Sequence, residues 1–370
     1  MELSSVTLHS LYNWTTPNIS SAEPSDKDGG FLFLAIAIYL TTIGIIAIFG
    51  NSLVLTVLLG DESLRRKPHN LLLISLAVCD LGVLLGGYPF TIISGYSQRW
   101  VFDDLTCKFA GFWTFFLSLT SMNTLVAVCV YRYIMICAPG KAFILTRSFT
   151  LYVIIGTWFY GFFWTALPLM GWGSYGLEPF LISCSLDWAN DNFSNVTYMV
   201  ATILFCYILH VVVMISCYRK ISKTVRELAE RDRERCRRIV SFEDMVHLSK
   251  VADDQQVTKM CFLVVLVFVG IWTPYALVCA VHIFYSLPLA ATALPTMCAK
   301  LGCMINPMVY FLSNKGFRNK TLRMLRWRKR ETADGSVVQR ELLKKFDKIT
   351  KDGIYLGTET IIMEKSETMF

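Results

Sequence analysis

Charged residues are scarce in this sequence, and their scarcity excludes an ordinary water-soluble domain. Of the 370 residues, only 17% are charged, whereas 54% are apolar. A soluble fold cannot bury that much apolar side-chain surface. The apolar residues also fall into long runs that approach the roughly 20 residues with which a helix crosses a hydrocarbon core. The composition therefore predicts an integral membrane protein.

The amino terminus lacks a cleavable secretory signal. Its first thirty residues are polar and acidic, without the basic start and short apolar stretch of such a signal. We therefore expect the first membrane span to direct its own insertion. Motifs of a hydrolase, a metal site or a channel filter are absent as well. The net charge of +7 comes from basic residues between and after the apolar runs, so we expect it to set topology and expect no nucleic-acid partner.

The cysteines lack the pattern of a disulfide framework. Most of the twelve cysteines lie inside apolar runs, where a thiol behaves as a small buried hydrophobic group. Two stand apart, because Cys107 begins the third apolar run and Cys184 lies in a polar loop beside aspartates. If both face an oxidising exterior, they can form a disulfide.

Hydropathy predicts seven membrane spans and thus an all-α bundle of seven transmembrane helices. The expected spans are 31–60, 68–97, 104–137, 148–171, 197–220, 257–284 and 290–313. The chain then divides into a glycosylated extracellular segment at 1–30, the bundle with its ligand pocket at 31–313, a membrane-surface helix at 314–327 and a flexible cytoplasmic tail at 328–370.

Lysine and arginine are almost absent from one set of connections between the spans. They gather in the other set, at Arg65, Arg66, Lys67, Lys141, Arg147, the connection 219–259 and the carboxy-terminal segment. The positive-inside rule therefore predicts a cytoplasmic location for the basic set and an extracellular amino terminus. Glycosylation acceptor patterns fall in the predicted exterior segments, at Asn13, Asn18, Asn192 and Asn195.

Residues 314–327 predict an amphipathic helix. Phe317, Leu322 and Leu325 form an apolar side, whereas Arg318, Lys320, Arg323 and Arg326 are basic. Such a helix lies on the inner membrane surface and is attracted to anionic lipid. Membrane lipid is therefore an expected partner.

A lysine, Lys300, lies in the middle of the seventh span. An ammonium group at membrane depth is costly unless it is paired, neutralised or exposed to water, so such residues are functional candidates. One chemical solution is to condense the amine with an aldehyde as a Schiff base, a known use of buried lysines. The alternative is a lysine that pairs with Asp80 or lines a polar channel.

Several motifs around this lysine resemble those of the rhodopsin-like G-protein-coupled receptors. They are Gly50-Asn51, Leu76-Ala77-Val78-Cys79-Asp80, Arg132 at the end of the third span, Trp158, Trp272-Thr273-Pro274 and Asn306-Pro307-Met308-Val309-Tyr310. Within that superfamily, a lysine six positions before the Asn-Pro pair is the mark of opsins, and Lys300 occupies that position. The stretches 76–82, 89–94, 99–102, 178–180, 183–184 and 186–188 are similar to neuropsins in particular. The resemblance covers about residues 31–327.

The resemblance implies retinal, as the 11-cis or all-trans isomer, bound to Lys300 as a Schiff base. A protonated Schiff base is a buried cation that needs an anionic partner. Many vertebrate visual opsins carry a glutamate three residues after the first disulfide cysteine, but Ala110 stands there in this sequence. Glu178, six residues before Cys184, matches the alternative counterion position; the competing reading is a solvated loop carboxylate. If Glu178 is too distant or too well hydrated, absorption moves toward the ultraviolet.

Matching positions also predict the pocket and the signalling residues. The expected pocket walls are Ser118, Leu119, Cys206, Tyr207, Trp272, Tyr275 and Ala299, each of which also has a plain core-packing interpretation. Trp272 is the strongest of these, because Pro274 weakens the helix and offers a bend that isomerisation could drive. Asn51, Asp80 and Asn306 are expected to form a buried polar network, with Pro307 and Tyr310 completing the signalling motif.

Two positions depart from the superfamily pattern. Tyr131 replaces the acid that normally precedes Arg132 and restrains it, which predicts raised activity in the dark unless Asp254 pairs with Arg132 instead. His210 replaces a proline of the fifth span, and we expect this exchange to remove a helix bulge. A histidine hydrogen-bonded within the bundle is the favoured interpretation of His210 over a proton switch.

The resemblance implies a light-sensing, multi-pass receptor of the plasma membrane rather than an enzyme. Light would isomerise retinal and open a cytoplasmic cleft for a heterotrimeric G protein, with the inhibitory or transducin type favoured by Asn314-Lys315, and arrestin would be a further partner. One alternative is a retinal photoisomerase or retinal store that signals weakly, for which Tyr131 and His210 argue. Another is a receptor for a diffusible ligand that keeps Lys300 only by descent.

Overall fold

The computed structural model describes residues 26–324, apart from 179, 189, 237–261, 264, 283, 286, 288 and 314. Several predicted features lie outside the described residues: the acceptor sites Asn13 and Asn18, the partner residue Asp254, Asn314 of the G-protein motif, the last three residues of the expected surface helix and the tail 328–370.

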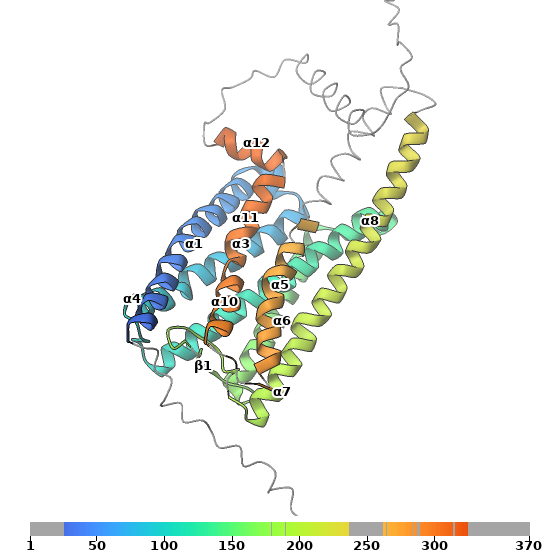
Figure 1. Ribbon diagram of the computed structural model, residues 1–370. Helices are drawn as coiled ribbons and strands as arrows, with labels where there is room; N and C mark the ends of the chain where they lie inside the picture. Colours follow the sequence, from blue (N-terminus) through green and yellow to red (C-terminus); the bar gives the residue numbers. More distant parts are fainter. Residues whose placement is uncertain are drawn as a thin grey trace, which may run out of the picture.

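Long helices running side by side make up nearly all of the described chain (Figure 1). In chain order the elements are α1 Asp26–Gly60, α2 Glu62–Arg65, α3 Pro68–Gly86, α4 Tyr88–Tyr96, α5 Asp104–Cys137, a 3-10 turn Pro139–Ile144, α6 Arg147–Ala166, a 3-10 turn Leu167–Met170, β1 Tyr175–Leu177, β2 Cys184–Leu186, α7 Phe193–Thr202, a π-helical turn Ile203–Ile208, α8 Leu209–Cys236, the helix Val265–His282, α10 Leu289–Lys300, α11 Gly302–Ser313 and α12 Lys315–Met324.

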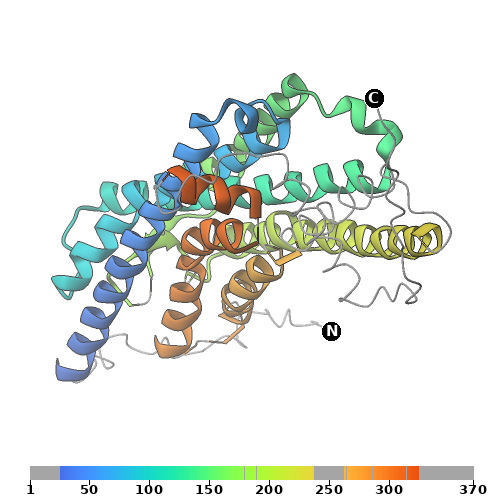
Figure 2. The ribbon, with the colours of Figure 1, turned by 90° about the horizontal axis from the view of Figure 1, so that it is seen from above.

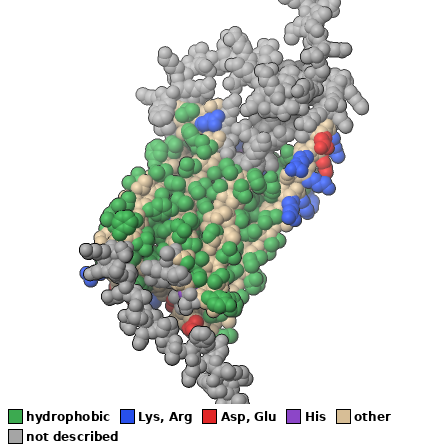
Figure 3. Space-filling view, in the orientation of Figure 1, with side chains coloured by type: hydrophobic (Ala, Val, Ile, Leu, Met, Phe, Trp, Pro, Cys, Tyr) green, Lys and Arg blue, Asp and Glu red, His purple; other side chains and the backbone are tan. Residues whose placement is uncertain are grey.

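Six of these helical stretches are long and apolar enough to cross a membrane, and the seventh span is divided into α10 and α11. Apolar side chains such as Phe31, Ile155 and Leu294 lie on the outside of the bundle, and Figure 3 shows an outer surface covered by hydrophobic side chains. Side chains of this kind suit contact with lipid rather than water. The predicted seven-helix membrane fold is therefore confirmed.

Polar residues just before the helices determine where three spans and the short helix α2 begin. Asp61, Asp103, Thr146 and Asn192 each accept a hydrogen bond on the side chain from the backbone N–H three residues later. This N-cap geometry satisfies a donor that has no partner within the helix. Hydrogen bonds from Thr106 hold the pKa of Asp103 below its usual range, so the cap stays ionised at neutral pH.

Three predicted spans differ from simple continuous helices. The second breaks at Gly87 into α3 and α4, because Pro89 follows and proline cannot donate the backbone hydrogen bond of a continuing helix. The seventh breaks after Lys300. The fifth was expected to end at residue 220, yet α8 continues to Cys236, because its last turns are rich in helix-forming charged residues, with Lys223 and Glu227 paired at 3.9 Å.

The expectation that His210 would remove a bulge from the fifth span was wrong. A π-helical turn, Ile203–Ile208, lies directly before the helix that contains His210. The turn therefore forms without a proline, and hydrogen bonds from neighbouring helices hold it in place, as described below.

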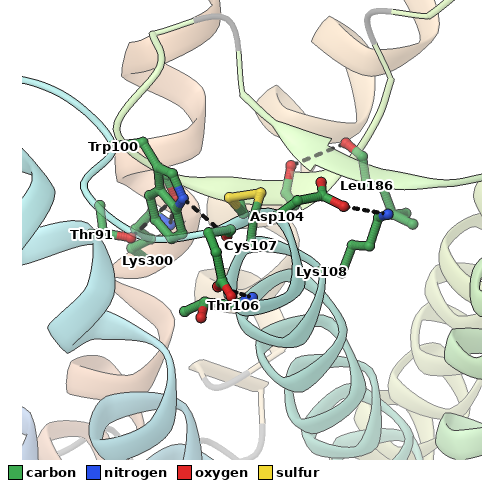
Figure 4. Close-up of a disulfide and its surroundings, with 12 residues drawn as sticks. Thr91, Trp100, Asp104, Thr106, Cys107, Lys108, Leu186 and Lys300 are labelled. Atoms are coloured by element: carbon green, nitrogen blue, oxygen red, sulfur yellow. Dashed lines mark hydrogen bonds and ion pairs between the residues drawn. A yellow bond between two sulfur atoms is a disulfide. The ribbon is translucent and has the colours of Figure 1, made fainter.

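A two-stranded hairpin covers one end of the bundle, opposite α12 (Figures 1 and 2). Strands β1 and β2 pair antiparallel, with Tyr175 opposite Leu186 and Leu177 opposite Cys184. A disulfide joins Cys184 to Cys107 at the start of α5 (Figure 4), as the sequence predicted. At the tip, Phe180 and Ile182 are buried in a cluster with residues of α1, α3 and α10. The hairpin is thus attached both covalently and by packing.

Glycine at position 111 allows the hairpin to lie directly on α5. A Cβ atom there would meet Tyr175 Cδ1 at 2.9 Å and the backbone oxygen of Ser185 at 3.3 Å. Both distances are shorter than those of ordinary van der Waals contacts, so the hairpin and α5 could not keep this spacing around a larger residue.

The acceptor pattern at Asn195 does not fit this fold. Its side chain is 5% exposed, and its Nδ2 donates to Ser174 Oγ at 3.0 Å and to the backbone oxygen of Asp187 at 3.0 Å. A glycan attached to Nδ2 would break both bonds and displace the loop. Asn192, in contrast, is exposed at the start of α7.

Helix α12 lies across the other end of the bundle (Figures 1 and 2). Lys320 Nζ lies 2.6 Å from Asp61 Oδ2 and 2.8 Å from Ser63 Oγ. The hydrogen bond from Lys320 holds the pKa of Asp61 well below its usual range. The predicted surface helix is therefore tied to the connection that follows α1.

We predict that Gly111→Ala destabilises the folded protein by about 1–3 kcal/mol, because the added methyl group overpacks the contact with the hairpin. Thermal unfolding of the purified protein in detergent measures this effect. Gly156→Ala in α6 is the matched control, since a Cβ at Gly156 meets nothing within 4 Å. That control should be neutral or stabilising, and an equal loss of stability in both variants would contradict the explanation.

Candidate functional site

Lys300 lies at the point where the seventh span breaks. α10 ends at Lys300 and α11 begins at Gly302, so backbone carbonyl groups near the break lose partners within the helix. The Tyr88 hydroxyl donates a hydrogen bond to the backbone oxygen of Lys300. Pro307 has no N–H for the oxygen of Cys303, and Asn51 Nδ2 donates to that oxygen at 2.8 Å. Side chains from other spans therefore compensate for the break, as a membrane interior requires.

The Lys300 amine contacts a hydroxyl group of the hairpin. Its Nζ donates to Ser183 Oγ at 3.3 Å, and Thr91 Oγ1 donates to the same oxygen at 3.2 Å. Figure 4 shows Thr91 and Lys300 close together, to one side of the disulfide. Ser183 is 1% exposed, so this chain of hydroxyl groups is shielded from solvent.

Asp80 does not pair with Lys300. Its carboxylate instead accepts hydrogen bonds from Asn306 Nδ2 at 2.9 Å and from Ser121 Oγ at 3.4 Å. Asp80 is 2% exposed, and these bonds offset part of the cost of burying a carboxyl group. Of the expected polar network, Asp80 and Asn306 bond each other, whereas Asn51 bonds the backbone oxygens of Ala47 and Cys303. The alternative, in which Lys300 pairs with Asp80, has no support in the geometry.

Glu178 is buried at the base of the hairpin turn. Its side chain is 2% exposed, and its Oε2 atom has no hydrogen-bond partner among the described residues. The backbone N–H of Glu178 donates to the oxygen of Ser183 at 2.8 Å, which places both residues on the same turn. A buried carboxylate oxygen without a partner is costly, so it marks a position at which a positive charge would be favourable.

One cavity inside the bundle joins Glu178 and Lys300. The predicted wall residues all line it: Ser118, Leu119, Cys206, Tyr207, Trp272, Tyr275 and Ala299. Ala110 is buried but does not line the cavity. Much of the wall is apolar or aromatic, with Phe115, Met122 and Phe268 among its residues, which suits a long apolar ligand carrying one polar end.

Sequence reasoning missed three residues around Lys300: Ser183 contacts the amine, Thr91 bonds Ser183, and Tyr88 bonds the backbone oxygen of Lys300. Ser183 had a signal, because it precedes the disulfide cysteine Cys184 and is therefore held over the bundle. Nothing in the local sequence of Thr91 or Tyr88 distinguishes them from other polar residues of a span.

At the end of the bundle opposite the hairpin, Tyr131 is packed among apolar side chains. Its ring is buried with Leu72 and Leu145 and lies 6.0 Å from the ring of His69. The Nε atom of Arg132 is buried and has no hydrogen-bond partner among the described residues. Tyr131 thus joins α5 to the connection before α6, and Asp254 lies outside the described residues.

Residues 50–310 match the family model "7 transmembrane receptor (rhodopsin family)". "Opsin-5" of Homo sapiens is 34% identical over 282 residues, which cover 75% of this chain and 77% of that protein. "Rhodopsin, G0-coupled" of Mizuhopecten yessoensis is 33% identical over 301 residues, or 79% of this chain and 72% of that protein. The chain belongs to the opsins of the rhodopsin family.

A solved structure supports the same assignment for this opsin. The crystal structure of squid rhodopsin matches with a TM-score of 0.74 and 26% sequence identity, and the match covers 80% of this chain and 86% of that chain. The opsin is therefore a multi-pass membrane receptor of the light-sensing class. Its motifs resemble those of neuropsins, and Opsin-5, a neuropsin, is among its relatives.

Proposed function

We propose that this opsin holds retinal covalently at Lys300 Nζ and signals light to a heterotrimeric G protein. One observation carries the proposal: the Lys300 amine and the buried, unpartnered oxygen of Glu178 line a single cavity with largely apolar walls. When bound, retinal supplies a light-driven change of shape. The opsin itself supplies the attachment point, the compensating charge and the shape of the pocket.

The residues around Lys300 have separate tasks. Glu178 supplies a negative charge that favours retention of a proton on the Lys300 nitrogen. Ser183 accepts a hydrogen bond from that nitrogen, and Thr91 orients the Ser183 hydroxyl. The disulfide at Cys184 and the buried tip of the hairpin keep these groups over the bundle and exclude water. A weakly screened charge of this kind is what sets the absorption of such a site.

Trp272 is positioned to transmit a change in the cavity to the helix that contains it. It lines the cavity and packs against Phe268 and Tyr275, at centroid distances of 6.0 Å and 6.2 Å. Pro274 follows and weakens the helix at that level. Movement of Trp272 would thus bend the helix Val265–His282 and open the cytoplasmic end for the G protein. The coupled G protein is proposed to be of the inhibitory or transducin type, with arrestin as a second partner.

A retinal photoisomerase that signals weakly is the second candidate function. Tyr131 is the sequence argument for it, because it departs from the acid of the superfamily's signalling motif and leaves Arg132 without that neighbour. His210 no longer argues for it, since the bulge of the fifth span is present. Light-dependent nucleotide exchange by a purified G protein separates the two candidates, because a photoisomerase would convert retinal without promoting exchange.

We predict that Lys300→Ala abolishes both covalent retinal binding and light-dependent nucleotide exchange, because no other amine among the cavity-lining residues replaces it. Acid denaturation after incubation with retinal, followed by a spectrum of the separated protein, measures the covalent link. Lys108→Ala is the control, since Lys108 forms an exposed ion pair with Asp104. Retinal that stays covalently attached to the Lys300→Ala protein would overturn the proposal.

We predict that Glu178→Gln shifts the absorption of the retinal-bound opsin strongly to shorter wavelength, toward the ultraviolet. The change removes the negative charge, so the Lys300 nitrogen holds its proton less tightly at neutral pH. Absorption spectra recorded across a pH series measure the shift and its reversal at low pH. Asp187→Asn, in the same loop but bonded to Ser174, should leave the spectrum unchanged. An unchanged Glu178→Gln spectrum removes Glu178 from this role.

We propose that the opsin lies in the plasma membrane with the hairpin end outside, and we predict a glycan on Asn192 but none on Asn195. Asn192 is exposed, whereas both polar atoms of the Asn195 side chain are engaged in the fold. Enzymatic deglycosylation and gel mobility of Asn192→Gln and Asn195→Gln measure occupancy. A mobility shift caused by Asn195→Gln alone would contradict the packing of that loop.

A further inference from the structure

The bulge of the fifth span is held by side chains of neighbouring helices. A π-helical turn such as Ile203–Ile208 contains one extra residue, so a backbone carbonyl within it loses its usual partner. The Tyr160 hydroxyl of α6 donates to the backbone oxygen of Phe205 at 3.2 Å. The hydrogen bond thus offsets the cost of the turn inside the membrane.

His210, whose ring lies 5.9 Å from that of Tyr160, bonds to α5 directly after the bulge. Asn123 Nδ2 of α5 donates to the backbone oxygen of Thr157 at 3.1 Å, which leaves Asn123 Oδ1 as an acceptor. His210 Nε2 lies 2.7 Å from that oxygen and therefore acts as the donor. His210 replaces proline in this chain and contributes a side-chain bond to α5 that proline could not make.

The bulge directs Tyr207 toward the sixth span. Tyr207 Oη and Thr273 Oγ1 lie 2.5 Å apart. Thr273 uses its single hydroxyl hydrogen to bond the backbone oxygen of Val269, at 2.5 Å. Tyr207 must therefore be the donor and Thr273 the acceptor, which gives the pair one direction. Both side chains are half-buried, so water competes little for this bond.

The hydrogen bond lies beside the residue that is positioned to move. Thr273 follows Trp272 directly, and Trp272 and Tyr207 both line the cavity. Pro274 comes next and weakens the helix at the same level. Any rotation of the helix that displaces Trp272 therefore also displaces the acceptor of Tyr207.

We infer that the hydrogen bond from Tyr207 to Thr273 is a clasp that keeps the fifth and sixth spans together in the resting receptor. Release of this clasp separates the cytoplasmic halves of the two spans. The clasp itself is independent of any ligand, whereas its release by light rests on the proposed function. Tyr207 and Thr273 are thus positioning residues that act on the helix arrangement, and they take no part in the chemistry at Lys300.

Spin-label distances test the clasp without retinal or a G protein. Nitroxide-bearing non-canonical residues are placed at the exposed positions Ile215 in α8 and Leu266 in the sixth span, and their distance distribution is recorded in the dark by pulsed electron paramagnetic resonance. Tyr207→Phe and Thr273→Val should each increase the ratio of the longer to the shorter distance by about threefold to tenfold, the effect of one hydrogen bond between membrane helices.

A double-variant cycle decides whether the two residues act through one bond. The variant with both changes should resemble Tyr207→Phe, because the second change has no bond left to remove. Thr42→Val and Tyr96→Phe are the matched controls; Thr42 bonds its own helix at Ile38, and Tyr96 is exposed on α4. The inference would be wrong if both single variants left the label distances unchanged. It would also be wrong if the double variant changed the distance ratio by the product of the two single effects.

Illumination of the retinal-bound protein then tests the light-driven step. The wild-type distance should lengthen in light, and the Tyr207→Phe protein should show part of that change already in the dark. If no pigment forms, the proposed function is wrong. The distances measured in the dark still test the clasp, because they need no retinal. If pigment forms and light leaves the label distance unchanged, the release step is wrong.

Discussion

A half-buried lysine amine inside the helix bundle is the constraint around which this structure is organised. Lys300 can lie there only because hydroxyl groups, a carboxylate and an apolar cavity surround it. Ser183 and Glu178 both belong to the hairpin, so the hairpin must be held firmly over the bundle. The disulfide to α5, the buried tip and the close approach at Gly111 all serve that end.

Breaks in the spans follow a common physical rule. Every irregular turn inside a bilayer frees backbone groups that water cannot reach, and a side chain from another helix must satisfy them. The side chain of Asn51 donates a hydrogen bond to the backbone oxygen of Cys303. Tyr88 donates in the same way to the backbone oxygen of Lys300, and Tyr160 to that of Phe205. The same bonds also join the helices to one another, so each irregular position is cross-linked to a neighbouring helix by a polar contact.

The end of the bundle around Tyr131 differs from the superfamily pattern in its packing and its charge. Tyr131 is buried against Leu72 and Leu145, which stabilises the connection before α6 through apolar contacts. The arginine beside it loses the neighbouring negative charge of that pattern. Restraint of the resting state must then come from elsewhere in the bundle, and the contact between the fifth and sixth spans provides a candidate within the membrane.

The sequence by itself determined the seven spans, the position of Lys300 and the two disulfide cysteines, because each depends on local hydropathy or on a short motif. The break at Lys300, the proline-free bulge and the burial of Asn195 were decided only by the tertiary structure. The partners of Lys300 were decided there too, since Ser183 is 117 residues away from it in the chain and 92 residues from Thr91. A hydrogen bond between distant segments has no local pattern, because its geometry exists only once the helices and the hairpin have packed.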